Sequence, residues 1–245
     1  MDNQDKRQSI LEHLTALRNM LVISAIVLLV AFTVIFSFGA DTLIKLLQQP
    51  ILERGISMIS IELTEPLLTK IKISLIAAAV VSCPVIIWQV WRFISPALYR
   101  NEKLAFWLIF LATVVLFLLG VVFCYGAVYV LTVEFFIAMG DGLGMMTPTL
   151  GAYIDYLFSF VVPFGLAFEL PVVLYITTKM GLTNYQMLAS KRKYIVLGVA
   201  IVAAILTPPD VVSQIMLIIP ILLLFEVGLL ITRIVKPKTK ETEEE

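Results

Sequence analysis

The chain has 245 residues, of which 60% are hydrophobic and 15% are charged, and its mean hydropathy is +0.99. Soluble domains contain about 45–50% apolar and about 25% charged residues, so this composition excludes a soluble enzyme, a disordered chain, a collagen and a disulfide scaffold. Basic and acidic residues balance at 18 each, so no basic excess points to nucleic acid. We expect an all-α integral membrane protein.

Residues 1–19 are polar, and Ile10, Leu14 and Leu17 recur in them at three- and four-residue spacing. This spacing predicts a cytoplasmic amphipathic segment suited to a membrane surface. The apolar run 20–38 follows and is long enough to cross a bilayer. A signal peptide is the alternative for this run, but the long segment of mixed charge before it favours a retained span.

Five more spans follow, joined by segments that the sequence predicts to be loops. The expected spans are 71–91, 104–125, 153–178, 194–206 and 211–232, and the longer loops are 40–68, 138–151 and 179–193. The fifth span has only 13 residues, about 20 Å of helix against a hydrocarbon core of about 30 Å. We therefore expect a six-helix domain over 20–233, with the last two helices short in membrane depth, and an acidic, disordered cytoplasmic tail over 234–245.

The distribution of lysine and arginine predicts the orientation. With a cytoplasmic N-terminus, 14 of the 18 basic residues lie on the cytoplasmic side. The positive-inside rule therefore places both termini in the cytoplasm.

Glu169 is an acid within the fourth span, and Pro163 and Pro171 flank it. A carboxylate at membrane depth is costly, so we expect either a hydrogen bond to a neighbouring helix or a polar point in a wet groove or partner site. Glu226 lies near the cytoplasmic edge and is expected to snorkel or to meet Arg233. Asp210 follows two prolines and is predicted to cap the sixth span.

The sequence offers little for catalysis. It has one histidine and two cysteines, Cys83 and Cys124, which lie in apolar runs and are expected to be free thiols. No metal-ligand spacing, phosphate loop or GxSxG motif is present. We expect no metal, no cofactor and no enzyme activity.

Four segments together resemble the TatC family, the multi-spanning core of the twin-arginine protein translocase. They are HLTALR at 13–18, SCPVIIWQVWRFISPALYRNE at 82–102, FGLAFELPV at 164–172 and LTPPDVVSQ at 206–214. The resemblance covers roughly residues 9–234. It implies a bacterial cytoplasmic membrane protein that binds twin-arginine signal peptides of folded cargo. It also implies single-span partners of the TatA and TatB type, self-association, and transport driven by the proton-motive force.

The resemblance also assigns roles to individual residues. The signal-peptide site maps onto Glu102 and Phe93, with Arg18 and Glu12 on the N-terminal segment. The intramembrane or partner positions map onto Glu169 and Pro50. The periplasmic turn maps onto Pro208, Pro209 and Asp210.

The chain departs from the family at one position of this site. The family signature His-Leu-x-Glu-Leu-Arg has its glutamate where this chain has Ala16. Glu12 lies one helical turn away on the same face and is a weaker substitute because charge-assisted bonds need close geometry.

Two other functions compete with this interpretation. A proton- or cation-coupled transporter of a small solute would use Glu169, but the sequence has no visible repeat and few other midplane polar groups. An intramembrane protease would need a nucleophile and base pair that the sequence lacks.

Overall fold

The computed structural model describes residues 2–98, 103–140, 147–207 and 209–235, without the side chains of 2–13, 94–98, 103 and 105. Within these ranges it contains helices and turns and no strand. Five helical stretches are long and apolar enough to cross a membrane: Leu14–Leu52, Glu65–Phe93, Phe106–Gly140, Leu150–Lys179 and Val211–Ile234. Many leucine, isoleucine and valine side chains on them are exposed, as lipid contact requires. The prediction of an all-α membrane protein is confirmed.

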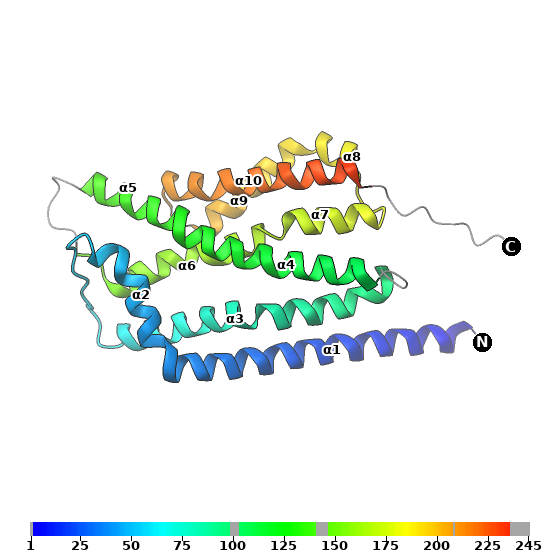
Figure 1. The fold of residues 1–245 in the computed structure, drawn as a ribbon, viewed down its shortest axis with the longest axis horizontal. Helices are drawn as coiled ribbons and strands as arrows, with labels where there is room; N and C mark the ends of the chain where they lie inside the picture. The colour runs from blue at the N-terminus through cyan, green and yellow to red at the C-terminus, as the bar shows by residue number, and fades with distance from the viewer. Residues whose placement is uncertain (1, 99–102, 141–146, 208, 236–245) are drawn as a thin grey trace. The chain divides into compact units, whose positions relative to one another are not determined.

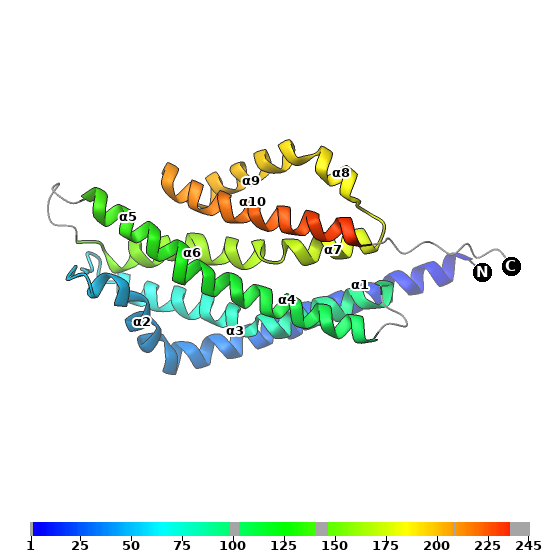
Figure 2. The same cartoon turned by 45° about the horizontal axis from the view of Figure 1, so that its top comes forward.

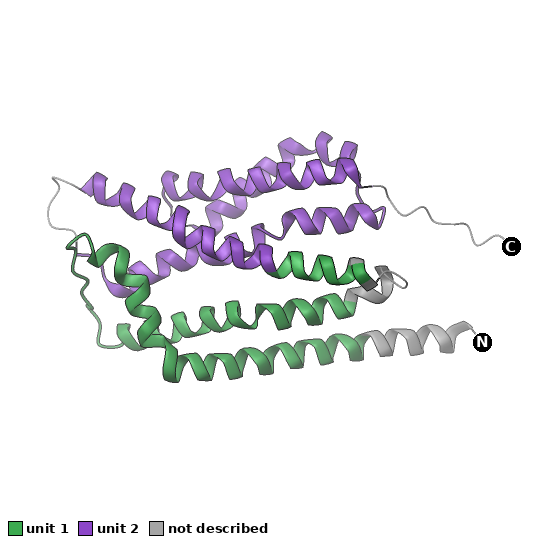
Figure 3. Cartoon of the chain, in the orientation of Figure 1, with its two compact units in different colours: residues 1–114 green, residues 115–245 purple. Residues whose placement is uncertain are grey.

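The chain forms two compact units, residues 1–114 and 115–245 (Figure 3). The first contains α1 (Asp2–Val34), α2 (Ala40–Leu52), α3 (Glu65–Leu98) and the start of α4 (Lys103–Phe123). In it, α1 packs along α3 (Figure 1). The helix α1 continues through residue 20, so the predicted surface segment 1–19 is not separated from the first span by a break.

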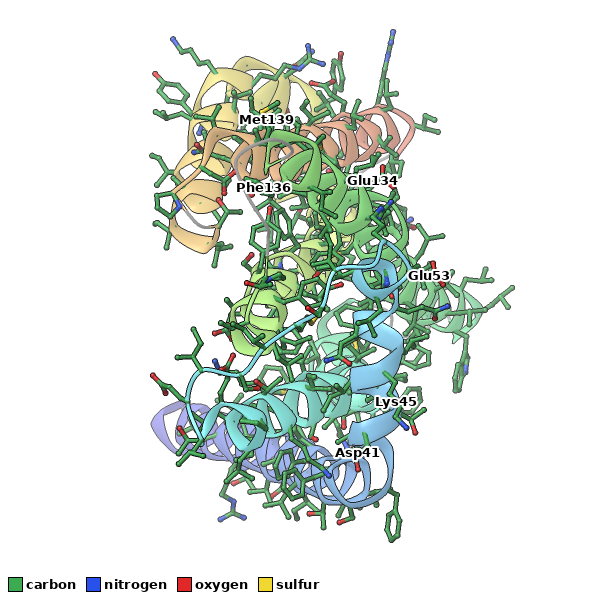
Figure 4. All side chains as sticks on the ribbon, turned by 90° about the vertical axis from the view of Figure 1, so that its left-hand side faces the viewer. Asp41, Lys45, Glu53, Glu134, Phe136 and Met139 are labelled. Carbon is green, nitrogen blue, oxygen red and sulfur yellow. The ribbon has the colours of Figure 1, made fainter. Side chains whose placement is uncertain are left out.

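A π-helical segment, Ile35–Gly39, joins α1 to α2, and the helix axis changes direction there (Figure 1). Segments of this type insert an extra residue into the helical ladder and commonly accompany kinks. Lys70 of α3 fixes the bend from the side: its Nζ lies 3.0 Å from Asp41 Oδ1 and 5.6 Å from the Phe36 ring centroid. Asp41 and Lys45 follow one another along α2, and Glu53 lies just past its end (Figure 4).

The prediction of a loop over 40–68 is wrong for its first part. Residues 40–52 are helical, and Pro50 lies inside α2. Proline has a helical φ but lacks the N–H that would bond to the carbonyl four residues earlier, and because α2 ends two residues after Pro50 the disturbance is confined to its last turn. The buried Ile51 gives this segment a side chain to pack, and Gly55 at φ +74° then turns the chain.

The second unit holds the larger aromatic core. It contains the end of α4, the π-helical segment Cys124–Tyr129, α5 (Val130–Gly140), α6 (Leu150–Ala167), α7 (Leu170–Lys179), α8 (Tyr185–Ser190), α9 (Arg192–Leu206) and α10 (Val211–Ile234). Tyr129, Phe160 and Phe164 are fully buried in it. Cys124 and Cys83 are buried thiols that form no disulfide, as predicted.

The helices α8 and α9 run back along α10 in both views (Figures 1 and 2). The predicted loop 179–193 contains the short helix α8. With 15 residues, α9 is about 22 Å long and shorter than a hydrocarbon core, so that prediction is confirmed. The last helix, α10, has 24 residues, two more than the predicted span 211–232, because the apolar run continues through Pro220 without a break.

Candidate functional site

A pocket of about 380 Å³ lies between α1 and α3 in the first unit. Five of its lining residues come from α1 and three from α3: Thr15, Ala16, Asn19, Met20, Ile23, Gln89, Arg92 and Phe93. The residues on α1 are spaced by three and four, so they form one helical face. The structure thus brings two positions that the sequence singled out, Ala16 and Phe93, into one pocket.

The remaining signal-peptide positions are only partly described. Glu12 lies within α1, but its side chain is outside the described part of the structure, and Glu102 lies outside the described residues altogether. Arg18 is exposed, and its Nη2 is 3.5 Å from Asn19 Oδ1, at the long limit for a hydrogen bond. Among the described lining residues there is no carboxylate, and the one charged side chain is that of Arg92.

Glu169 stands at an interruption between α6 and α7. The helix α6 ends at Ala167 and α7 begins at Leu170, with Glu169 as its N-cap residue and Pro171 at the second position. Pro171 has no N–H to donate to the carbonyl four residues earlier, so the ladder breaks there. Pro163 lies inside α6 without ending it.

The Glu169 side chain is half-buried, and its Oε1 is fully buried without a hydrogen-bond partner among the described residues. The candidate span Leu150–Lys179 contains this position. An unpaired buried carboxylate oxygen is costly.

Two glycines let neighbouring helices approach the interruption closely. A Cβ on Gly120 of α4 would lie 2.9 Å from the Phe164 carbonyl oxygen. A Cβ on Gly228 of α10 would lie 3.2 Å from Pro171 Cα. The interrupted helix is therefore held between α4 and α10 within the second unit.

The turn before α10 is built around Asp210. Its Oδ1 accepts a 2.7 Å hydrogen bond from the Ser213 backbone N–H, which confirms the predicted N-cap. Pro209 precedes it as an exposed residue, and Pro208 lies outside the described residues. One turn of helix further, the Ser213 hydroxyl forms a hydrogen bond with the Tyr156 hydroxyl of α6.

The sequence analysis missed the polar contacts that join this turn to other helices. Besides the pair of Tyr156 and Ser213, the Gln214 amide donates to the Ala200 carbonyl of α9 at 3.3 Å. The signal available in the sequence was the presence of polar residues near the starts of two predicted spans, Tyr156 in 153–178 and Ser213 and Gln214 in 211–232. No group of three or more His, Cys, Asp or Glu that could hold a metal occurs among the described residues.

Comparison with known proteins identifies the family. The family model of the Sec-independent protein translocase protein TatC matches residues 12–220. The chain belongs to the TatC family. The TatC of Carboxydothermus hydrogenoformans is 36% identical over 96% of this chain and 97% of its own length. The TatC of Aquifex aeolicus is 39% identical over 95% of this chain and 98% of its own length.

The TatC of Escherichia coli is 32% identical over 97% of this chain and 93% of its own length. A crystal structure of the twin-arginine translocase receptor TatC has a TM-score of 0.84 to this chain at 38% identity. That match covers 91% of this chain and 98% of the crystallised one. This chain is therefore a component of a Sec-independent protein translocase, and the alternative of a small-solute transporter does not fit a TatC protein.

Proposed function

We propose that this TatC protein is the receptor and scaffold subunit that binds twin-arginine signal peptides of folded cargo. The observation that carries the proposal is the pocket between α1 and α3, which contains Ala16 and Phe93. Glu102 follows Phe93 by nine residues and supplies a carboxylate for paired hydrogen bonds to arginine. Glu12 and Arg18 complete the proposed site.

The test measures direct binding of a labelled twin-arginine signal peptide to the purified chain in detergent, with fluorescence anisotropy of the peptide as the readout. A twin-lysine peptide of equal charge is the control, because lysine lacks the planar fork of arginine. We expect tighter binding of the twin-arginine peptide. Equal affinity for both peptides would contradict a twin-arginine receptor.

The second unit is the proposed place of partner assembly. Glu169 offers an unpaired buried oxygen at membrane depth, which suits a polar group of a single-span partner of the TatA or TatB type. Pro50 and the turn of Pro208, Pro209 and Asp210 shape the proposed periplasmic side. The short α9 favours local thinning of the bilayer, which eases passage of folded cargo under the proton-motive force.

We further propose that the protein lies in the bacterial cytoplasmic membrane with both termini in the cytoplasm, and that it self-associates. The distribution of lysine and arginine supports this orientation. Both Val211 and Ser190 are exposed, so single cysteines at these positions can report it. A membrane-impermeant maleimide added outside should label Val211→Cys and leave Ser190→Cys unlabelled. The reverse pattern contradicts the orientation.

A further inference from the structure

The predicted spans place the pocket between α1 and α3 at the level of a membrane surface. The first predicted span begins at residue 20 and the second ends at residue 91, and residues around both of these ends line the pocket. Beside it, Trp88 packs against Phe106 and Trp107, with ring centroids 5.7 and 5.1 Å away. Aromatic clusters of this kind mark the headgroup layer of a bilayer.

The polar part of the lining consists of hydrogen-bond donors around one cation. The Arg92 side chain is exposed, and Gln89 is one helical turn before it on the same face of α3. Gln89 is only 9% exposed. The Asn19 carbonyl oxygen faces Arg18, which leaves its amide N–H groups as donors.

This arrangement suits an anion. A guanidinium and amide N–H groups bind phosphate oxygens through charge-assisted hydrogen bonds, and the planar fork of arginine matches phosphate geometry. No carboxylate among the described lining residues competes for Arg92.

The rest of the lining is apolar. Met20, Ile23 and Phe93 border the same pocket, whose volume of about 380 Å³ falls within the range of small-molecule sites. A lipid fits both parts, because its phosphate can meet Arg92 while its glycerol and first methylene groups meet the apolar side chains.

We propose that this pocket binds the phosphate group of an anionic membrane lipid, with Arg92 as the anchoring cation and Gln89 and Asn19 as donors. Free inorganic phosphate has the same chemistry and is the simpler possible ligand. The proposal goes beyond twin-arginine recognition and does not depend on it, although it uses the same pocket: the peptide arginines are assigned to Glu102 and Glu12, and the phosphate is assigned to Arg92.

The experiment uses the full chain, purified in a neutral detergent. Phosphatidylglycerol and phosphatidylcholine are titrated by native mass spectrometry, and inorganic phosphate by calorimetry. Arg92→Gln removes the anchoring charge, and we expect it to weaken phosphatidylglycerol binding about tenfold or more. Arg92→Lys keeps the charge and should retain most of the affinity. Arg233→Gln is the matched control, because Arg233 is an exposed arginine at the end of α10 and outside the pocket.

Ala16→Glu is a second, independent variant. It places a carboxylate in the pocket lining and should weaken phosphate binding by repulsion. Preference for phosphatidylglycerol over inorganic phosphate identifies the lipid as the ligand. Comparable binding of inorganic phosphate that depends on Arg92 supports the site with the free ion as its ligand.

The proposal is overturned if Arg92→Gln weakens neither phosphatidylglycerol nor inorganic phosphate more than Arg233→Gln does. The twin-arginine peptide is titrated against the same samples in a separate assay. If lipid and phosphate binding do not depend on Arg92 but the peptide binds, only this proposal is rejected. If lipid or phosphate binding depends on Arg92 but the peptide does not bind, only the receptor function is rejected.

Discussion

Arg192 and Glu226 form an ion pair between the start of α9 and the body of α10, with Nη2 2.8 Å from Oε2. The sequence analysis expected Glu226 to snorkel or to meet Arg233, and the pairing with Arg233 is wrong. The Arg233 guanidinium instead lies 5.8 Å from the centroid of the Tyr185 ring. The reason is tertiary: the chain folds α8 and α9 back along α10, which brings Arg192 within reach of Glu226.

This ion pair should contribute little to stability. Both side chains are nearly half exposed, at 48% and 45%, and exposed pairs contribute about 0.2–1 kcal/mol. We expect a double-mutant cycle of Arg192→Gln and Glu226→Gln to give a coupling energy in that range, measured by unfolding in mixed micelles. A coupling energy above about 2 kcal/mol would show a pair shielded from water.

Glu102→Lys should abolish binding of a twin-arginine peptide and leave the fold intact. The variant places a positive charge against the incoming arginines, whereas a substitution at a membrane edge costs little stability. Anisotropy measures the binding, and circular dichroism with size-exclusion chromatography checks the fold. Glu102→Gln is the milder control and should weaken binding less. Normal peptide binding by Glu102→Lys contradicts the assigned site.

Ala16→Glu should raise the affinity for a twin-arginine peptide by about 1–3 kcal/mol. Ala16 is exposed and lines the pocket between α1 and α3, so a glutamate side chain at this position has room and faces the proposed site. Titration of the labelled peptide against the native chain and the variant measures the gain. Equal binding by both proteins would remove position 16 from the receptor.

Glu169→Ala should weaken assembly with single-span partners or transport while initial peptide binding stays unchanged. The unpaired Oε1 lies in the second unit, whereas the pocket belongs to the first. Copurification of the partners and peptide anisotropy on the same sample separate the two effects. Full partner assembly and transport by Glu169→Ala would assign the residue an internal structural role.

Gly120→Ala should destabilise the protein by about 1–3 kcal/mol. The new Cβ would lie 2.9 Å from the Phe164 carbonyl oxygen and 2.9 Å from Phe168 Cγ, and the backbone oxygen cannot move aside cheaply. Gly198→Ala is the matched control, since nothing lies within 4 Å of its Cβ and alanine favours a helix by about 0.5–1 kcal/mol. Thermal unfolding of the two variants compares them, and equal stability of both would contradict the close packing of α4.

The sequence by itself determined the class of protein and most of its helices. Apolar runs of about 20 residues can only be satisfied by helices in a bilayer, so the spans followed from composition and length. The short α9 followed from the spacing between Lys193 and Thr207. The cap at Asp210 followed from local chemistry, because it depends on neighbours within four residues.

Tertiary structure decided the contacts between residues far apart in the chain. The pairing of Arg192 with Glu226, the hydrogen bond of Tyr156 with Ser213, and the pocket that joins Ala16 to Arg92 all depend on which helices pack together. In a membrane protein almost every helix is apolar on all sides, so periodicity does not reveal which face meets which neighbour. Single polar residues within apolar spans can therefore be identified from the sequence, whereas their partners depend on how the helices pack.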